Sequence, residues 1–511
     1  MRLTHDESLA ASTGSTLPAA PAQPVIVTPF SGDYRVDALL ENLDFRWNAS
    51  QPVGTAVTVT YSFMSSAPTY GGTNSGGDTG FVAFSAEQQA AVQAMLADIS
   101  SQTGLTFTQV NDSTSSYGQL RFGNNYQAQS SGYAWLPSST GDAKSGDVWI
   151  NVDNSTGLSA GSFNLSTLYH ETLHALGLKH PGNYNAGETS DASVKTNSLG
   201  VVEDNLQYTI MSYRDAANGL QQKSIGLYDL LALQYLYGAR NTQTGNNLYT
   251  LTSQDTGLMQ LINDNGGTDT LDASSLNTGL TIDLNAGKFS SIGASNNLAI
   301  AVGAVIENAR GGSGSDTLTG NSANNVLTGQ GGNDVIDGGS GIDTASYSGR
   351  LADYTRSGNT ITDNRGTDGQ DQLTNIERLQ FSDVSLALDT SQSGAAGQAY
   401  GLWYAATHRT AGAAELGLVL KGFDSGQTAT QVAQSILDTY APTLSSSALV
   451  SVLFQNIVGS APDSTTLNNL SAQIDNGSYT KGQFYALAAG LEANYVQFAG
   501  VVSNGAEYLY A

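Results

Sequence analysis

A repeat of nine residues between Gly311 and Ser346 constrains the fold of this chain more than any other feature. Its four consecutive units read GGSGSDTLT, GNSANNVLT, GQGGNDVID and GGSGIDTAS. This is the pattern of a parallel β-roll, in which each unit supplies a glycine-rich loop and a very short strand. The eighth position of each unit is expected to point inward, and the residues there are Leu318, Leu327, Ile336 and Ala345.

The same repeat predicts calcium sites. Ca²⁺ takes six to eight oxygen ligands, which backbone carbonyls of glycine loops and carboxylates from adjacent turns can supply. The second unit is degenerate, with Asn321, Ala323 and Asn325 in place of acid and glycine, so we expect it to bind more weakly. A disordered glycine linker is the alternative, but it does not account for aliphatic residues at a fixed period. The expected ligands are Gly312, Gly314, Asp316, Gly329, Gly331, Gly332, Asp334 and Asp343.

A second motif, HETLHALGLKH at residues 170–180, has the spacing of a zinc hydrolase. His170 and His174 are four residues apart and share one face of a helix. Gly177 can take a left-handed conformation that ends the helix and returns His180 as a third ligand. Three neutral imidazoles with an open position are typical of a catalytic zinc site. Glu171 is then placed to act as the general base and afterwards as the acid.

The alternative for this motif is an amphipathic helix with surface histidines. The whole chain holds only five histidines, and three of them fall within these eleven residues. We therefore favour the zinc site.

Downstream, the segment Gln207–Tyr213 reads QYTIMSY. With the zinc motif it resembles the serralysin family, the secreted bacterial metzincin metalloproteases with calcium-binding RTX repeats. The resemblance covers residues 33–350. It implies that Met211 underlies the zinc ion and that Tyr213 is a displaceable zinc ligand that assists at the oxyanion.

The resemblance also implies features outside the zinc motif. Tyr133, Ala134 and Trp135 resemble the cleft-edge strand that pairs with extended substrate, a strand-addition mode of recognition; plain core packing is the alternative. Further calcium ligands are implied at Glu307 and in an earlier loop that contains Asp264, Gly266, Gly267 and Asp269. The turn at residues 243–246 lacks the Arg and Asp usual in the family.

Local patterns predict the elements around the site. Ser85 and Gln88 form a capping-box pattern before a helix to residue 102. Residues 105–110 and 119–122 alternate like strands. Residues 228–238 predict a helix that closes the catalytic domain.

Composition bounds the function. Acidic residues outnumber basic ones 44 to 19, giving a net charge of −25, which argues against nucleic-acid binding. The absence of cysteine excludes disulfides, cysteine-ligated zinc and thiol catalysis. Residues 1–25 lack the apolar core of a signal peptide, and no apolar run is long enough to cross a membrane. As in serralysins, we expect export by a type I secretion machinery.

The predicted architecture is multidomain. Residues 1–32 form a mobile N-terminal segment or propeptide, and residues 33–240 an α+β metzincin-type catalytic domain. Residues 241–390 form the RTX parallel β-roll region. Residues 391–511 form an all-α domain with two similar halves offset by 51 residues, each predicted to hold two helices around a D-x-G turn. His408 lies there without partners and is expected to be an ordinary surface residue.

These features predict a secreted zinc endopeptidase, stabilised by several calcium ions, that acts on protein or peptide substrates. Two rivals stay open at this point. One is a calcium-dependent surface or adhesion protein whose protease site is secondary or latent. The other is a protease dedicated to one partner, such as a cell surface layer.

Overall fold

The computed structural model describes residues 2–5, 20–68, 79–128, 130–138, 141–182, 184, 197–240, 243–264 and 266–510. The chain divides into two compact units, which are described separately. The first comprises Met1–Leu276 with Leu280–Ile306, and the second comprises Asn277–Gly279 with Glu307–Ala511.

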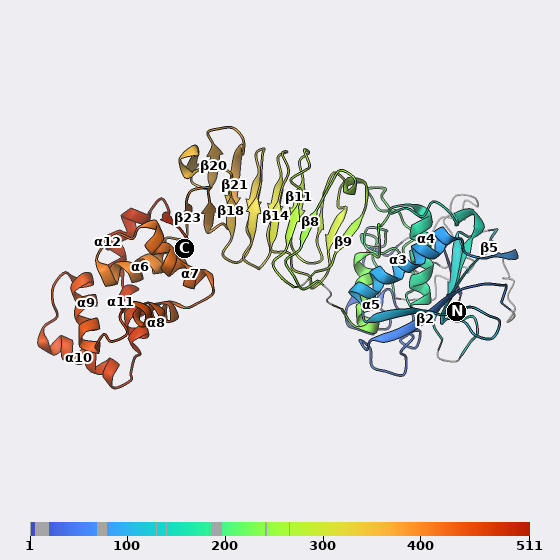
Figure 1. Ribbon diagram of the computed structural model, residues 1–511, viewed down its shortest axis with the longest axis horizontal. Coiled ribbons are helices and arrows are strands. Elements are labelled where there is room, and N and C mark those ends of the chain that lie inside the picture. Colours follow the sequence, from blue (N-terminus) through green and yellow to red (C-terminus); the bar gives the residue numbers. More distant parts are fainter. Residues whose placement is uncertain are drawn as a thin grey trace. The chain divides into compact units, whose positions relative to one another are not determined.

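A seven-stranded mixed sheet organises the first unit (Figure 1). The order along the sheet is β1 (Arg2–His5), β6 (Gly132–Trp135), β7 (Asp147–Asn151), β5 (Leu120–Tyr126), β2 (Val57–Phe63) and β4 (Leu105–Gln109), with β3 (Thr79–Val82) paired to β5. Strands β7, β5, β2 and β4 pair in parallel, β6 pairs antiparallel with β7, and β1 at the edge pairs antiparallel with β6. Every residue of β7 is buried, as expected for an inner strand of a parallel sheet.

Helices α3 (Ala86–Gln102) and α4 (Phe163–Ala175) contact strands of this sheet, and α5 (Leu227–Tyr237) contacts the short α2 (Tyr34–Asp37). Helix α3 begins with the predicted capping box, in which Ser85 and Gln88 each bond the other's backbone N–H. Its apolar residues Val92, Leu96 and Ile99 lie one turn apart and are buried. The predicted helices and strands of this region are confirmed with end shifts of one to four residues.

The N-terminal segment differs from the expectation of mobility where it is described. Residues 2–5 form strand β1. Val25 forms an isolated bridge with Ser198, and the backbone N–H groups of Val27 and Thr28 donate to the side chain of Asn197. Residues 6–19 lie outside the described residues. That this segment is a propeptide stays a prediction.

The remainder of the first unit is built from short strands. These are β8 (Leu248–Thr250), β9 (Gln260–Ile262), β10 (Thr270–Asp272), β11 (Thr281–Asp283), β12 (Phe289–Ser290) and β13 (Leu298–Ile300). Strands β12, β13 and β9 form a three-stranded sheet.

The second unit begins with the predicted roll (Figure 1). Its strands are β14 (Asn308–Arg310), β15 (Thr317–Thr319), β16 (Val326–Thr328), β17 (Val335–Asp337), β18 (Thr344–Ser346), β21 (Gln370–Thr374), β22 (Arg378–Gln380) and β23 (Ser385–Ala387), with the hairpin β19 (Tyr354–Ser357) and β20 (Thr360–Asp363) inserted. Alternate repeats pair in parallel: β14 with β16, β16 with β18, and β15 with β17. The eighth-position residues are 0–1% exposed, which confirms that they point inward.

A helical lobe follows, with α6 (Ala395–Thr407), α7 (Ala413–Asp424), α8 (Ala429–Tyr440), α9 (Ser446–Val458), α10 (Ser464–Asp475), α11 (Lys481–Ala489) and α12 (Glu492–Val502). Helices α9 and α10 repeat α6 and α7 at an offset of 51 residues. The two similar halves are present, but each holds three helices instead of the predicted two: two helices precede each D-x-G turn and one follows it. The region is also not purely helical, since β24 (Ala506–Tyr508) pairs with β23 of the roll.

Among the described residues, no helix is both long and apolar enough to cross a membrane.

Candidate active site

Helix α4 carries the first half of the site. Ser162 caps its N-terminus by accepting from the N–H of Leu165, and residues 166–175 are all buried. The helix ends before Gly177, whose φ is +105°. A Cβ at that position would lie 2.3 Å from the carbonyl oxygen of Phe45, so the turn requires glycine. The chain then returns and delivers His180 to the face that carries His170 and His174.

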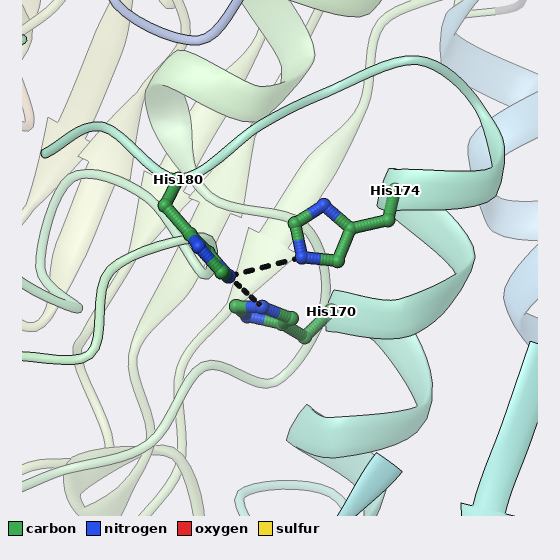
Figure 2. A group of neighbouring side chains, drawn as sticks. All are labelled: His170, His174 and His180. Atoms are coloured by element: carbon green, nitrogen blue, oxygen red, sulfur yellow. Dashed lines mark hydrogen bonds between the residues drawn. The ribbon is translucent and has the colours of Figure 1, made fainter. Parts of the chain in front are cut away.

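The three histidines converge on one point (Figure 2). His180 Nε2 lies 3.0 Å from the Nε2 atoms of both His170 and His174. Their metal-capable nitrogens all lie within 4.8 Å of one another, and all three residues are at most 1% exposed. The structure therefore brings the predicted zinc ligands together.

The other ring nitrogens are held by backbone carbonyls. His170 Nδ1 lies 2.7 Å from the oxygen of Ile210, His174 Nδ1 2.7 Å from that of Leu178, and His180 Nδ1 2.9 Å from that of Tyr184. A carbonyl can only accept, so each neutral ring carries its proton on Nδ1 and presents a lone pair at Nε2. With the His180 lone pair 3.0 Å from the Nε2 atoms of both other rings, the cluster fits a cation better than hydrogen bonds among the rings.

Glu171 lies beside this cluster and is fully buried. A Cβ at Gly132 of strand β6 would lie 2.8 Å from its Cγ and 3.2 Å from its Oε1. Glycine at 132 therefore lets the strand approach the carboxylate closely. Helix α4 also contacts β6 and β7 along its length.

The turn that contains Met211 lies next to the histidines. Met211 is fully buried, and the Tyr213 ring lies with its centroid 4.3 Å from that of His180 and 5.7 Å from that of His170. The structure thus places both residues of the predicted methionine turn at the site.

Asp229 of α5 holds this turn through hydrogen bonds. Its carboxylate accepts from the N–H groups of Ile210 and Gly226 and from the hydroxyl of Thr209. Burial raises the pKa of Asp229 to about 6, against the lowering effect of these donors. Since Ile210 provides the carbonyl that holds His170, Asp229 helps to position the ring of this predicted ligand.

A network around Tyr184 was missed by sequence reasoning. The Tyr184 hydroxyl donates to Asp204, which also accepts from Ser212 and forms an ion pair with Arg214 at 3.1 Å. Tyr184 stacks on His180 at 5.7 Å, and its carbonyl holds that ring. The only available signal was the tyrosine four residues after the third histidine, and it carries no periodicity.

Strand β6 holds the three residues predicted to bind substrate. Tyr133 and Ala134 are buried, and the Tyr133 hydroxyl accepts from Asn125, so their side chains belong to the core. Trp135 is only partly buried, so its side chain and the backbone of β6 are left for recognition. One edge of β6 pairs with β7, and β1 pairs with the other, so the edge expected for substrate carries residues 2–5 of the chain itself.

The roll forms a second candidate metal region. In the roll, backbone N–H groups donate to side-chain carboxylates of the next turn and so form two columns. In the first column the N–H of Asp316 donates to the carboxylate of Asp334, and the N–H of Asp334 donates to that of Asp371. In the second column the N–H of Asn325 donates to the carboxylate of Asp343, and the N–H of Asp343 donates to that of Glu377. Asp371 and Glu377 were missed because the inserted hairpin interrupts the nine-residue period before them.

The acids of these columns are crowded. Burial and neighbouring carboxylates raise the pKa values of Asp334 and Asp371 to about 7 and that of Asp343 to about 6. Among the described residues, one buried oxygen each of Asp334 and Asp343 has no hydrogen-bond partner. Gly332, with φ +112°, adopts a conformation that only glycine takes readily. Buried carboxylate oxygens without a hydrogen-bond partner suit a hard cation, which takes oxygen ligands.

The earlier predicted loop, in the first unit, is arranged differently. Asp264 accepts from Asn247, from the Tyr249 hydroxyl and from the N–H of Gly266. Asp269 accepts from the N–H of Asn247, and Gly267 passes so near Gly245 that a Cβ would lie 2.2 Å from its oxygen. Side-chain donors already occupy much of Asp264, so this loop favours a cation less than the two columns do. In the second unit, Glu307 meets the Asn325 side chain through its backbone oxygen.

Comparison with known proteins shows similarity to one family and to several curated proteins. Residues 231–421 match the family described as Peptidase M10 serralysin C terminal. The chain is 38% identical over 304 residues to Serralysin C of Dickeya chrysanthemi, covering 53% of this chain and 60% of that protein. It is 34% identical over 309 residues to Serralysin of Proteus mirabilis, covering 54% and 62%. It is 34% identical over 291 residues to Metallopeptidase AprA of Pseudomonas marginalis, covering 51% and 60%.

The chain thus spans about 60% of the length of the curated relatives it matches. The match to the serralysin C-terminal family and the identity to several serralysins identify the chain as a relative of the serralysin-type metalloproteases.

Proposed function

We propose that this chain is a secreted zinc-dependent endopeptidase that hydrolyses peptide bonds of extracellular or cell-surface proteins, with calcium folding and stabilising its roll. One observation carries the proposal. Three Nε2 atoms converge beside the buried Glu171 while every Nδ1 is held by a carbonyl.

His170, His174 and His180 would hold the metal. Zinc in such a ligand set polarises a carbonyl group and lowers the pKa of water. Neutral imidazoles without thiolates suit zinc, and the carbonyls behind them fix both tautomer and ring orientation.

Proton transfer falls to Glu171. Its carboxylate takes a proton from the attacking water and passes it to the leaving amine. The hydroxyl of Tyr213 is assigned to the developing oxyanion, since its ring lies against His170 and His180.

Substrate would bind as an extended strand on β6, through the backbone of Tyr133, Ala134 and Trp135. Strand addition draws its affinity from main-chain hydrogen bonds, which agrees with the burial of the Tyr133 and Ala134 side chains.

Calcium is assigned to the roll, between the turns of its two carboxylate columns. Asp316, Asp334 and Asp343 contribute carboxylates, with glycine carbonyls of the repeat loops. Glu307 and the Asp264–Asp269 loop stay weaker assignments. Export by a type I secretion machinery rests on the likeness to serralysins.

The test is digestion of casein by the full chain in calcium, with and without 1,10-phenanthroline, beside Glu171→Ala. We expect cleavage that the chelator and the substitution each abolish. Zinc content gives a second readout: His174→Asn should lose the metal, while His408→Asn should keep it. His408 is an exposed residue at φ +53°, a conformation that asparagine tolerates, so it is a matched control.

Absence of cleavage from a folded, zinc-loaded chain would contradict the proposal. It would favour the calcium-dependent surface protein instead.

A further inference from the structure

A polar cavity of about 480 Å³ lies beside the C-terminal ends of β5 and β7, the N-terminal end of β6 and the start of α4. Six of its lining residues carry the argument: Gln127, Ser130, Ser131, Asn151, Asp153 and Phe163. Neither the proposed proton transfer nor the metal cluster uses them.

The floor of the cavity is a fixed set of polar groups. Ser130 Oγ donates to Gln127 Oε1 at 2.6 Å, and Asn151 Nδ2 donates to the backbone oxygens of both residues. Gln127, Ser130 and Asn151 are only 7–8% exposed. A preorganised polar floor of this kind suits a polar side chain better than an aliphatic one.

The cavity is also acidic at its mouth. Asp153 is exposed, and no hydrogen bond or ion pair of its carboxylate occurs among the described residues. None of the described lining residues is Lys or Arg. A cationic group entering the cavity would therefore meet an uncompensated negative charge.

Its position follows from the chain. Ser131 directly precedes Gly132, which lies against Glu171. Phe163, which lines the cavity, precedes Glu171 by eight residues on α4, so the two lie about 12 Å apart along the helix. At about 3.3 Å per extended residue, a bound peptide covers this distance with three to four residues.

Strand β1 gives the direction in which such a peptide runs. It pairs antiparallel with β6, with Arg2 opposite Trp135 and His5 opposite Gly132. A peptide bound in the same sense passes Trp135 first and reaches Glu171 at the residue opposite Gly132. The residues that follow it then pass Ser131 and Ser130 and arrive at the cavity.

We propose that this cavity is the subsite for the third or fourth residue after the scissile bond, and that it selects cationic side chains through Asp153 and amide side chains through its floor. The inference rests on the proposed function and names a substrate class for it: proteins with Lys, Arg or Gln shortly after the cleaved bond.

The test uses peptides that differ only at those two positions, with Lys, Gln, Leu or Glu. For the wild-type chain we expect kcat/KM to fall in that order, with each exposed charge effect about two- to fivefold. Asp153→Asn should equalise Lys and Gln, and Asp153→Lys should favour Glu over Lys. Asp44→Asn, which removes an exposed carboxylate elsewhere, is the control and should leave the order unchanged.

A flat profile, or a preference that both Asp153 variants retain, would overturn this inference while leaving the peptidase intact. Failure of the wild-type chain to cleave any of the peptides, or casein, would overturn the proposed function and this inference with it.

Discussion

The two candidate metal regions solve opposite electrostatic problems. At the histidine cluster the predicted ligands are neutral rings, and a backbone carbonyl holds each ring at 2.7–2.9 Å. In the roll the predicted ligands are acids whose pKa is raised by burial and by neighbouring carboxylates, to about 7 at Asp334 and Asp371. Hydrogen bonds to the backbone hold the first arrangement, whereas burial and like charge oppose ionisation in the second.

This difference indicates two uses of a metal within one chain. A preformed neutral site needs its ion for chemistry. A crowded acidic column needs its ion in order to fold, because binding free energy then becomes folding free energy. The following predictions test this distinction, from the largest effect to the smallest.

Selective metal removal should separate the two regions. We expect calcium chelation to abolish amide hydrogen-exchange protection in residues 317–346, and zinc removal by 1,10-phenanthroline to leave residues 163–182 protected. The readout is exchange followed peptide by peptide by mass spectrometry. Equal loss of protection in α4 on zinc removal would show that the histidine site is not preformed.

An exchange of acid and amide between the columns should shift calcium affinity in opposite directions. Asp316→Asn removes a carboxylate from the first column, and Asn325→Asp adds one to the second, at matched positions of the repeat. We expect affinity to fall about tenfold in the former and to rise in the latter, because ligand charge count tunes calcium binding. Calcium titration by calorimetry measures both. Identical affinities in the two variants would mean that these positions are not ligands.

The stability of the calcium-free roll should fall as pH rises. Asp334 and Asp371 titrate at about 7 when folded and Asp343 at about 6, whereas an unfolded aspartate titrates at about 3.9. Between these values the folded roll holds protons that the unfolded chain has released. The contribution of these carboxyl groups to the free energy of unfolding is therefore fully present below about pH 4 and is lost as the pH rises through about 7. Urea midpoints in EDTA should therefore be higher at pH 5 than at pH 8.

Calcium should reverse that order, because it binds the ionised carboxylates. Asp334→Asn is the matched control and should flatten the dependence measured in EDTA. A midpoint in EDTA that rises from pH 5 to pH 8 would contradict the crowding of these acids.

The smallest effect concerns the catalytic region, where strand β1 pairs with the edge of β6 that faces away from β7. Deleting residues 2–5 should lower the KM for peptides several-fold. Strand β1 belongs to the same chain and competes with the peptide for β6 at an effective concentration of about 1 mM. Replacing the same four residues by alanine keeps the backbone pairing and should leave KM near that of the parent chain. An unchanged KM after the deletion would show that β1 does not compete with substrate.

Most of the correct predictions of fold and site came from residue spacings that repeat over short stretches of the sequence. The i, i+4 spacing of His170 and His174 fixes their shared helix face, and the nine-residue period fixes the inward side chains of the roll. Gly177 was recognisable because its turn needs a positive φ, which few other residues accept.

Contacts between distant segments could not be predicted in the same way. The pairing of β1 with β6 and the network from Tyr184 to Asp204 depend on the folded catalytic unit, and no short-range pattern encodes them. Asp371 and Glu377 continue the columns after an inserted hairpin, whose strand β20 pairs with β21 at the end of the sheet. Each half of the helical region was predicted to hold two helices around its D-x-G turn, so one helix of each half was missed.

Strands β23 and β24 are direct neighbours, with Ser385 opposite Tyr508 and Ala387 opposite Ala506. Topologically they are the two arms of one β-hairpin, and the seven helices between them are its enlarged loop. The lobe therefore departs from and rejoins the sheet at a single edge, and Arg378 of the adjacent strand fixes it there through Asp389 and Asp424. A short turn in place of the helices would still leave that hairpin closed, so the lobe is a module that a lineage can gain, lose or exchange without reopening the roll.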